Sequence, residues 1–318
     1  MTVERRRRAG VKRKRAVRRR ATVAIIGAGR MGTALARALH SCGYEITAVV
    51  SRKRSHARRA AELVTAHPQA LTPDQLDKLP TSDILLITTP DDVIETVAEE
   101  LAIKLKKERD DEGRRFAVAL HTSGALSSEV LRSLRRAGLS VGSMHPLVSV
   151  NDPVHGASSL RSAFFCIEGE EVAVRVARKV VRALGAESFS IARTEKALYH
   201  AAAVMASGHV TALFDIAVEM LKVCGLRERR ARAILLPLVR SALENLSTGT
   251  PAQALTGTFA RADLATVKRH LKALNTEKMS DALAAYVLLG KRSLQLAQRA
   301  GVRPDVLKEI ERALTNDK

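Results

Sequence analysis

Four side chains of types that commonly move protons stand in two pairs along the chain. Ser123 and His145 each follow an apolar run typical of a β-strand. Lys196 and His200 are four residues apart, so they share one face if this segment is helical. A hydroxyl, an imidazole and an amine suit the interconversion of an alcohol or amine with a carbonyl or imine, in which a proton moves as a hydride moves.

Each of these residues also has a purely structural interpretation. Ser123 could cap the helix that follows it, and His145 could be a satisfied turn residue before a proline. Lys196 could be a surface residue in the first helical turn, and His200 a packed interface histidine. The place of His145, at the carboxyl end of a predicted parallel strand, favours function, because such sheets bind ligands there. His121 is interpreted as structural.

A dinucleotide would supply the hydride, and residues 21–39 predict a site for one. A β-type run, the sequence Gly27-Ala-Gly-Arg-Met-Gly32 and a helix-forming stretch follow one another. Gly27 permits the tight turn, Gly29 lets the backbone approach a pyrophosphate, and Gly32 lets the helix pack closely on the sheet. The free N–H groups at the start of the helix would then face the phosphates.

The end of the second predicted strand, Glu45–Val50, selects the form of the cofactor. A carboxylate about 20 residues beyond the glycine turn would bind a ribose 2′-hydroxyl. This chain instead has Ser51-Arg52-Lys53-Arg54, and three cations at a helix start fit a 2′-phosphate, hence NADP. The predicted cofactor contacts are Gly27, Gly29, Arg30, Met31, Gly32, Ser51, Arg52, Thr89 and Pro90.

The fold predicted from these patterns is α/β, a Rossmann-type parallel sheet followed by an all-helical domain. We expect a disordered basic tail over 1–20, an NADP-binding domain over 21–170 and a helical substrate and dimerisation domain over 171–318. The further strands are predicted at 82–89, 116–120, 139–144 and 162–169. Strand patterns stop at Glu171, and Thr194 to Cys224 is predicted to form one long, buried helix.

A loop between the later helices offers candidate substrate contacts. Arg261 could grip a carboxylate or phosphate of the substrate, with Asn245 and Thr256 nearby in the sequence. Alternatively, Arg261 and Asp263 could pair with other parts of the helical bundle. No metal site is predicted.

Charge and composition limit which partners the protein could bind and in which cellular compartment it could work. Residues 1–20 hold eleven Lys and Arg against the single Glu4, so this tail carries half of the net charge of +20 in 318 residues. A basic run without aromatic residues is interpreted as a solvated extension, and nucleic-acid binding through it is the weaker alternative. Three scattered cysteines suit a reducing compartment, and no apolar run is judged long enough to span a membrane, so we expect a cytoplasmic protein.

Several of these motifs occur together in one family. GAGRMG, HTSGALSSEVL, HPL, the stretch from Lys196 to Ser207, and ALTG followed by A-R-x-D resemble domain-of-unknown-function family 2520, Rossmann-like proteins often named NADP oxidoreductases. The resemblance covers residues 21–275 and implies a Rossmann domain plus a helical dimerisation domain. The chain departs from the family pattern at Gly208, Thr258 and Ala262.

Two other groups are more distantly similar. In prephenate dehydrogenases a serine and a His-Pro pair touch the substrate hydroxyl, and Ser123 and His145-Pro146 resemble that pair. In the 6-phosphogluconate and ketopantoate reductase group, a lysine and an asparagine four residues on act on the substrate. Lys196 matches that lysine, whereas His200 stands in the place of the asparagine.

The sequence therefore predicts an NADP-dependent oxidoreductase that transfers a hydride between NADP(H) and a small carbonyl, hydroxy or imine compound. Its predicted partners are that small molecule and a second copy bound through the helical domain. The alternative is a non-catalytic, NADP-binding regulatory or scaffold dimer.

Overall fold

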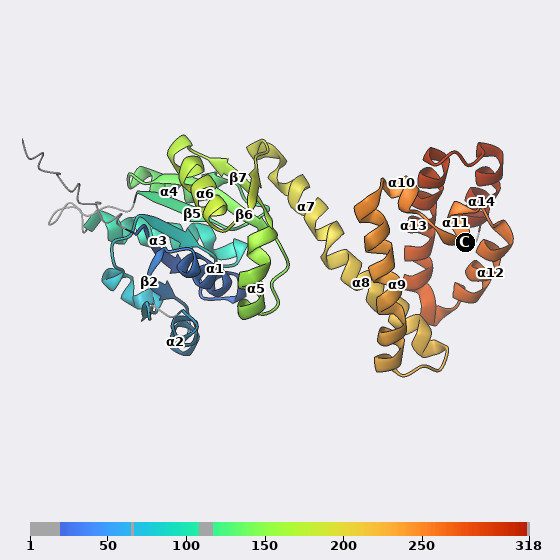
Figure 1. The fold of residues 1–318 in the computed structure, drawn as a ribbon, viewed down its shortest axis with the longest axis horizontal. Coiled ribbons are helices and arrows are strands. Elements are labelled where there is room, and N and C mark those ends of the chain that lie inside the picture. Colours follow the sequence, from blue (N-terminus) through green and yellow to red (C-terminus); the bar gives the residue numbers. More distant parts are fainter. Residues whose placement is uncertain (1–19, 65–66, 108–116, 317–318) are drawn as a thin grey trace, which may run out of the picture. The chain divides into compact units, whose positions relative to one another are not determined.

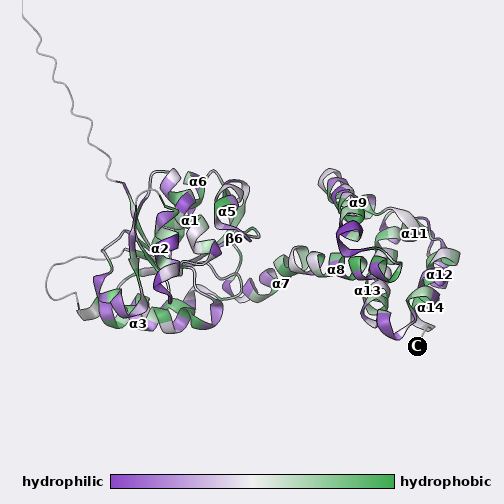
Figure 2. Cartoon of the chain, turned by 90° about the horizontal axis from the view of Figure 1, so that it is seen from below, coloured by the Kyte–Doolittle hydropathy of each residue, from purple (hydrophilic) through white to green (hydrophobic). Residues whose placement is uncertain are grey.

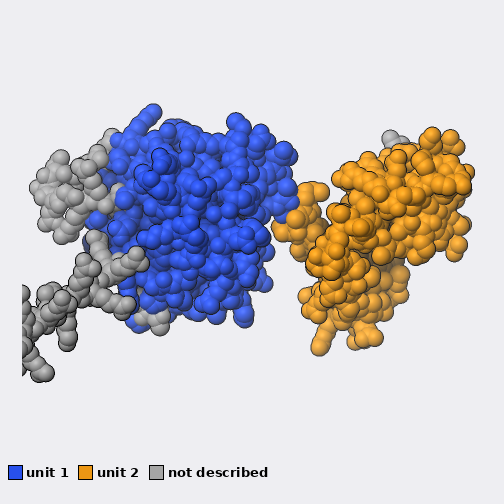
Figure 3. All heavy atoms as spheres, turned by 45° about the horizontal axis from the view of Figure 1, so that its top comes forward, with its two compact units in different colours: residues 1–203 blue, residues 204–318 orange. Residues whose placement is uncertain are grey.

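The structure is a computed structural model that describes residues 20–64, 67–107 and 117–316. The predicted basic tail lies outside the described residues, apart from Arg20. The chain divides into two compact units, residues 1–203 and 204–318 (Figure 3).

The first unit is built on one eight-stranded sheet (Figure 1). Its strands are β1 (Thr22–Ile26), β2 (Glu45–Val50), β3 (Gln69–Leu71), β4 (Ile84–Ile87), β5 (Val118–His121), β6 (Ser140–Leu147), β7 (Phe164–Gly169) and β8 (Glu187–Phe189). They are ordered β3-β2-β1-β4-β5-β6-β7-β8, and all neighbours are parallel except β6 and β7. The strand order reverses between β1 and β4, where open α/β sheets form a ligand crevice at their carboxyl ends.

Helices cover both faces of this sheet, which confirms the predicted fold class. They are α1 (Arg30–Ser41), α2 (Arg54–Glu62), α3 (Ile94–Lys107), α4 (Arg132–Arg136), α5 (Pro153–Ser159) and α6 (Glu171–Ala183). Single turns lie at η1 (Pro73–Lys78), η2 (Asp91–Val93), η4 (Ser128–Leu131), η5 (Leu160–Ser162) and η6 (Arg193–Glu195). Val23 and Ile25 pack in one core with α1 and α6, whereas Ala24 and Ile26 pack in the other with α3. Burial on both faces explains why β1 is continuously apolar.

Two strands and one strand end differ from the sequence-based expectation. β3 and β8 have three residues each, too few to show an alternating pattern. β6 continues through His145 to Leu147, because its last four residues extend past β5 and pair with antiparallel β7. Since α6 and β8 pack on the sheet, the compact boundary falls at 203/204 rather than after residue 170.

The second unit is entirely helical among its described residues. Its helices are α7 (Lys196–Ala206, which begins in the first unit), α8 (Gly208–Val223), α9 (Glu228–Thr248), α10 (Pro251–Ala254), α11 (Gly257–Ala260), α12 (Leu264–Leu274), η7 (Glu277–Met279), α13 (Ser280–Arg299) and α14 (Pro304–Asn316). Val267, Leu271, Leu294 and Ile310 form its core, which joins α12, α13 and α14.

The single long helix predicted for 194–224 is interrupted. Ser207 has φ −128° and ψ −72°, which ends α7 before Gly208 starts α8, and serine and glycine are both weak helix formers. Within the described residues, Arg193–Val223 is the one stretch that could cross a membrane by length and composition, with a hydropathy of 1.5. No charged residue separates Lys196 from Asp215, so this stretch reaches a length that the sequence analysis did not expect, but the break at Ser207 divides it into two shorter helices, α7 and α8.

Candidate functional site

The glycine turn between β1 and α1 has the geometry that its sequence predicts. Gly27 has φ +112°, and a Cβ there would lie 2.7 Å from the Thr88 carbonyl carbon. A Cβ on Gly32 would lie 2.0 Å from the Gly27 carbonyl oxygen. A Cβ on Gly29 would meet no atom within 4 Å. Gly27 and Gly32 are therefore required by packing inside the protein, whereas the bare Gly29 faces open space.

That open space belongs to a cavity at the carboxyl ends of β1, β2 and β4. Its volume is about 830 Å³. Its wall includes the glycine turn, the residues that follow β2 and the residues that follow β4, among them Gly27, Gly29, Ser51, Arg52, Lys53, His56, Thr88, Thr89 and Pro90. The structure thus brings the predicted Ser51, Arg52, Thr89 and Pro90 to one cavity. Arg30 is the exposed first residue of α1 and Met31 packs against the core beneath it, and neither lines the cavity.

A polar atom in this wall is left without a partner by the protein. The Thr89 hydroxyl oxygen is buried and has no hydrogen-bond partner among the described residues. Two features of α1 also suit a bound phosphate: no side chain caps the start of the helix, and no acidic side chain lies in its first turn. A buried hydroxyl, free helix N–H groups and the Arg52 cation are the donors that a phosphate-bearing dinucleotide would use.

Ser123 connects this cavity to the second candidate cluster. Its hydroxyl donates to Asp91 Oδ2 at 2.7 Å, and Asp91 directly follows Thr89 and Pro90. The same hydroxyl accepts from the Ala125 and Leu126 N–H groups at 3.2 and 3.0 Å. Ser123 therefore stabilises the turn after β5, and the N-cap residue of η4 is Ser127, so Ser123 is not the helix cap considered for it.

His145 is held by a tyrosine that the sequence analysis did not select. His145 Nδ1 and the Tyr199 hydroxyl are 2.7 Å apart. Burial, with smaller contributions from Lys196 and His200, lowers the pKa of His145 to about 4. Burial also raises the pKa of Tyr199. Near pH 7 the imidazole is thus neutral and the phenol protonated. We assign the phenol as the donor to Nδ1, which places the ring proton on Nε2.

His200 and Gly124 complete the surroundings of His145. The His145 and His200 rings pack edge to face with centroids 5.7 Å apart. A Cβ on Gly124 would lie 2.4 Å from His200 Cδ2 and 2.8 Å from His145 Nε2. Gly124 is thus needed because the two imidazoles occupy the space of a side chain, and Nε2 of His145 lies beside its bare Cα.

Lys196 is buried rather than exposed to this site. The side chain is 1% exposed, and its ammonium donates to the Ser123 carbonyl at 3.1 Å and the Ser143 hydroxyl at 2.8 Å. Burial lowers the pKa of Lys196, while Cys166, Glu168 and Asp91 oppose that shift. The amine therefore ties the start of α7 to the turn after β5 and to β6. The interpretation of Lys196 as a surface residue is wrong.

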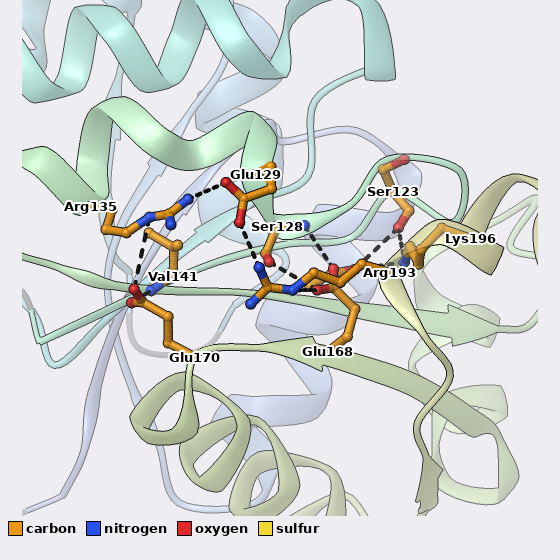
Figure 4. A network of polar contacts seen from close by, with 10 residues as sticks. Ser123, Ser128, Glu129, Arg135, Val141, Glu168, Glu170, Arg193 and Lys196 are labelled. Carbon is orange, nitrogen blue, oxygen red and sulfur yellow. Dashed lines mark hydrogen bonds and ion pairs between the residues drawn. The ribbon is translucent and has the colours of Figure 1, made fainter.

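A network of carboxylates and arginines leads to Lys196 (Figure 4). Glu168 in β7 accepts from the Ser128 N–H at 2.7 Å and hydroxyl at 2.9 Å, and Arg193 Nε lies 3.3 Å from it. Arg193 also donates to Glu129 at 2.6 Å. These contacts connect the segments on which Ser123 and Lys196 are carried.

The remaining candidates lie in the second unit. Asn245 and Thr256 line one hollow of about 360 Å³ with Gln253. Asp263 caps α12 by accepting from the Thr266 N–H and hydroxyl at 3.0 and 2.8 Å, so its role there is structural. Contact of Asn245, Thr256 and Arg261 with a substrate stays a prediction.

Sequence reasoning missed Tyr199, Gly124, Asp91 and Glu168 as members of the site. Tyr199 follows Lys196 by three residues, which is helical spacing and was a usable signal. Glu168 is one carboxylate in an otherwise apolar strand, and buried acids are rare unless paired. For Asp91 and Gly124 the signal lies only in the tertiary contacts.

The fold is a Rossmann-like α/β unit followed by a helical unit. Residues 9–146 match the Rossmann-like domain, and residues 163–293 match the domain of unknown function DUF2520. Both matches agree with the family that the sequence motifs resemble.

Solved structures show the same architecture. Protein TM1727 from Thermotoga maritima is 23% identical, with a TM-score of 0.65 over 87% of this chain and 99% of that one. Protein BF3122 from Bacteroides fragilis is 20% identical, with a TM-score of 0.68 over 87% and 98%. Pyrroline carboxylate reductase from Plasmodium falciparum, with NADP bound, is 12% identical, with a TM-score of 0.53 over 94% and 97%. No curated protein matches the chain. At these identities the likeness establishes the fold.

Proposed function

We propose that this protein is an NADP-dependent oxidoreductase acting on a small carbonyl, hydroxy or imine compound. The observation that carries the proposal is the cavity at the reversal of strand order, with an open Gly29, the Arg52 cation and the unpartnered Thr89 hydroxyl in its surroundings. Among the similar folds, BF3122 is named as an NADP oxidoreductase and the Plasmodium enzyme as a pyrroline carboxylate reductase, which supports this class of reaction.

Different residues of the cavity wall would contact different parts of the cofactor. The backbone of Gly27 to Gly29 and the start of α1 would hold the pyrophosphate, because N–H groups and the positive helix end meet there. Ser51 and Arg52 would hold the 2′-phosphate through charge-assisted hydrogen bonds. Thr89 would donate its buried hydroxyl to the part of the cofactor near the carboxyl end of β4. When bound, the cofactor supplies or accepts the hydride.

His145 is the residue best suited to stabilise the charge that develops on the substrate. Its Nε2–H lies beside Gly124, where it can donate to an oxygen or nitrogen that gains negative charge. Burial raises the pKa of Tyr199 and so keeps the phenol protonated. His145 would therefore stabilise the developing charge by its hydrogen bond, and the proton that the product gains would come from solvent. Lys196 stabilises these groups by its charge and its two hydrogen bonds, and protonation of a substrate by Lys196 itself would require one of those bonds to be exchanged.

A fluorescence titration with NADPH and NADH in parallel tests the cofactor assignment. We expect a preference for NADPH that Arg52→Ala reduces by about ten- to a hundredfold, the value of one or two hydrogen bonds to a charged group. The matched control is Arg58→Ala, an exposed cation on α2 outside the cavity wall. Equal binding of the two cofactors would refute the 2′-phosphate assignment, and binding of neither would refute the proposed function.

Self-association is the second part of the proposal, and it rests on the second unit. Hydrophobic residues alternate with hydrophilic ones along its helices (Figure 2). Several large apolar side chains among them are exposed, including Leu238 at 68%, Leu243 at 54% and Leu288 at 70%. Exposed apolar surface of this kind often marks a protein interface, so we infer that a second copy covers it. A cytoplasmic location stays a prediction from the scattered cysteines. Light scattering should show a dimer that Leu238→Glu dissociates and that Val172→Glu, an exposed apolar position on α6, leaves intact.

A further inference from the structure

One buried carboxylate joins the three segments that carry the candidate site. Glu168 lies in β7 and is 5% exposed. It binds Ser128, which begins η4 after the turn that carries Ser123 and Gly124. It also pairs with Arg193, which begins η6 and lies three residues before Lys196. An ionised group at this depth is retained only when it is fully paired.

Arg193 is held on two sides. Its Nε faces Glu168 at 3.3 Å and its NH1 donates to Glu129 at 2.6 Å. Glu129 is also bound by Arg135, which reaches Glu170 at 3.8 Å, and Glu170 accepts from the Val141 N–H at 2.9 Å. The start of α7 is thereby fixed to η4, to α4 and to the strands beneath them (Figure 4).

The residues that surround His145 from the helical side follow directly after that attachment in the chain. Lys196, Tyr199 and His200 all lie within the first five residues of α7. Tyr199 reaches His145 by the 2.7 Å hydrogen bond and His200 by ring packing. Lys196 reaches the acceptors on Ser123 and Ser143. Hydrogen bonds of this kind fail when one partner moves by about an ångström.

We propose that Glu168 and Arg193 are positioning residues: their ion pair fixes the start of α7 against the turn after β5, and so sets the contacts that Lys196, Tyr199 and His200 make around His145. This inference rests on the proposed function only in treating His145 as the reacting group. The pair itself contacts neither the cofactor cavity nor His145.

The test is an NMR titration of the His145 imidazole in the full chain without substrate. The charged and titratable groups that face His145 are Lys196, Tyr199 and His200 on α7, His121 on β5, and Cys166, its pairing partner on β7. If Arg193→Met frees the start of α7, water reaches the ring and the Lys196 and His200 charges move away. We then expect the proton affinity of His145 to rise at least tenfold, a pKa change of one unit or more from about 4 toward 6.5.

The matched control is Arg175→Met, which removes an exposed ion pair with Glu171 on α6, 3.0 Å long, and should leave the His145 titration unchanged. Arg193→Lys keeps the positive charge, so the pKa of His145 should stay close to its value in the parent protein. Glu168→Gln keeps nearly the same side-chain shape but removes the other charge of the ion pair, so it should raise the pKa of His145 as Arg193→Met does. An unchanged His145 titration in Arg193→Met would overturn the inference.

NADPH binding, measured on the same samples, separates the two proposals. We expect Arg193→Met to bind NADPH as the parent does, because the cavity wall is built from other residues. A parent protein that binds no cofactor would refute the proposed function and leave the titration result standing. Weakened NADPH binding in Arg193→Met alone would show that the pair supports the whole first unit, and would also overturn the positioning role.

Discussion

Gly29→Ala should weaken NADPH binding without destabilising the fold, whereas Gly32→Ala should destabilise the fold. The Gly29 backbone is extended, with φ −79° and ψ −170°, so an alanine fits its conformation. Its Cβ would meet no protein atom within 4 Å, and we expect the free energy of unfolding to change by no more than about 0.5 kcal/mol. The new methyl group would stand where the pyrophosphate approaches. Losing one or two charge-assisted hydrogen bonds there weakens binding about ten- to a hundredfold or more.

At Gly32 the same methyl group would lie 2.0 Å from the Gly27 carbonyl oxygen and 2.4 Å from the Thr88 hydroxyl. The carbonyl belongs to the turn itself and cannot rotate away, so we expect the overpacking cost of about 1–3 kcal/mol. Each kcal/mol lowers the melting temperature of a unit of this size by about 2–4 °C. Calorimetry and NADPH titration of both variants make the comparison. The reasoning is refuted if Gly29→Ala binds NADPH as tightly as the parent, or if Gly32→Ala melts at the parental temperature.

Three further predictions follow from the same contacts. Burial holds the pKa of His121 at about 3 and that of His145 at about 4, below the usual 6.5, so their contribution to stability is complete above about pH 6.5 and is lost as the pH falls toward 4. Urea unfolding at several pH values should show this loss, and His121→Asn should reduce it. Gly124→Ala should displace the His145 and His200 rings, visible as NMR shifts of both imidazoles, while NADPH binding persists. Ala262→Gly should raise the free energy of unfolding by up to about 1 kcal/mol in a denaturation assay, because Ala262 has φ +52°.

The elements that the sequence predicts best are those whose burial is uniform. β2 has the predicted bounds, Glu45–Val50, because a buried strand leaves a clear apolar pattern. β3 and β8 were missed because three residues hold no period. The break at Ser207 was missed because the apolar residues on either side continue the helical pattern across it.

The candidate site was predictable in its parts and not in its connections. The glycine turn, Arg52 and His145 carry local signals, either a motif or a place at a strand end. Tyr199 bonds to a residue 54 positions away, and Glu168 to one 40 positions away. Their roles therefore depend on tertiary contacts that no local sequence pattern predicts. The buried position of Lys196 has the same origin, since its acceptors come from two other segments.

The contacts of the four predicted catalytic residues rank them as donors to the substrate. Ser123 already donates to Asp91 and accepts from two N–H groups, so it could act on a substrate only by leaving its turn. Lys196 is enclosed and bound to two acceptors. His145 has one nitrogen fixed by Tyr199 and the other beside a bare Cα, with His200 packed against its edge. We therefore infer that His145 donates to the substrate, that Tyr199 and His200 hold its ring, and that Ser123 and Lys196 stabilise the turn beside it. His145→Gln should then reduce turnover of any substrate found far more than it reduces NADPH affinity.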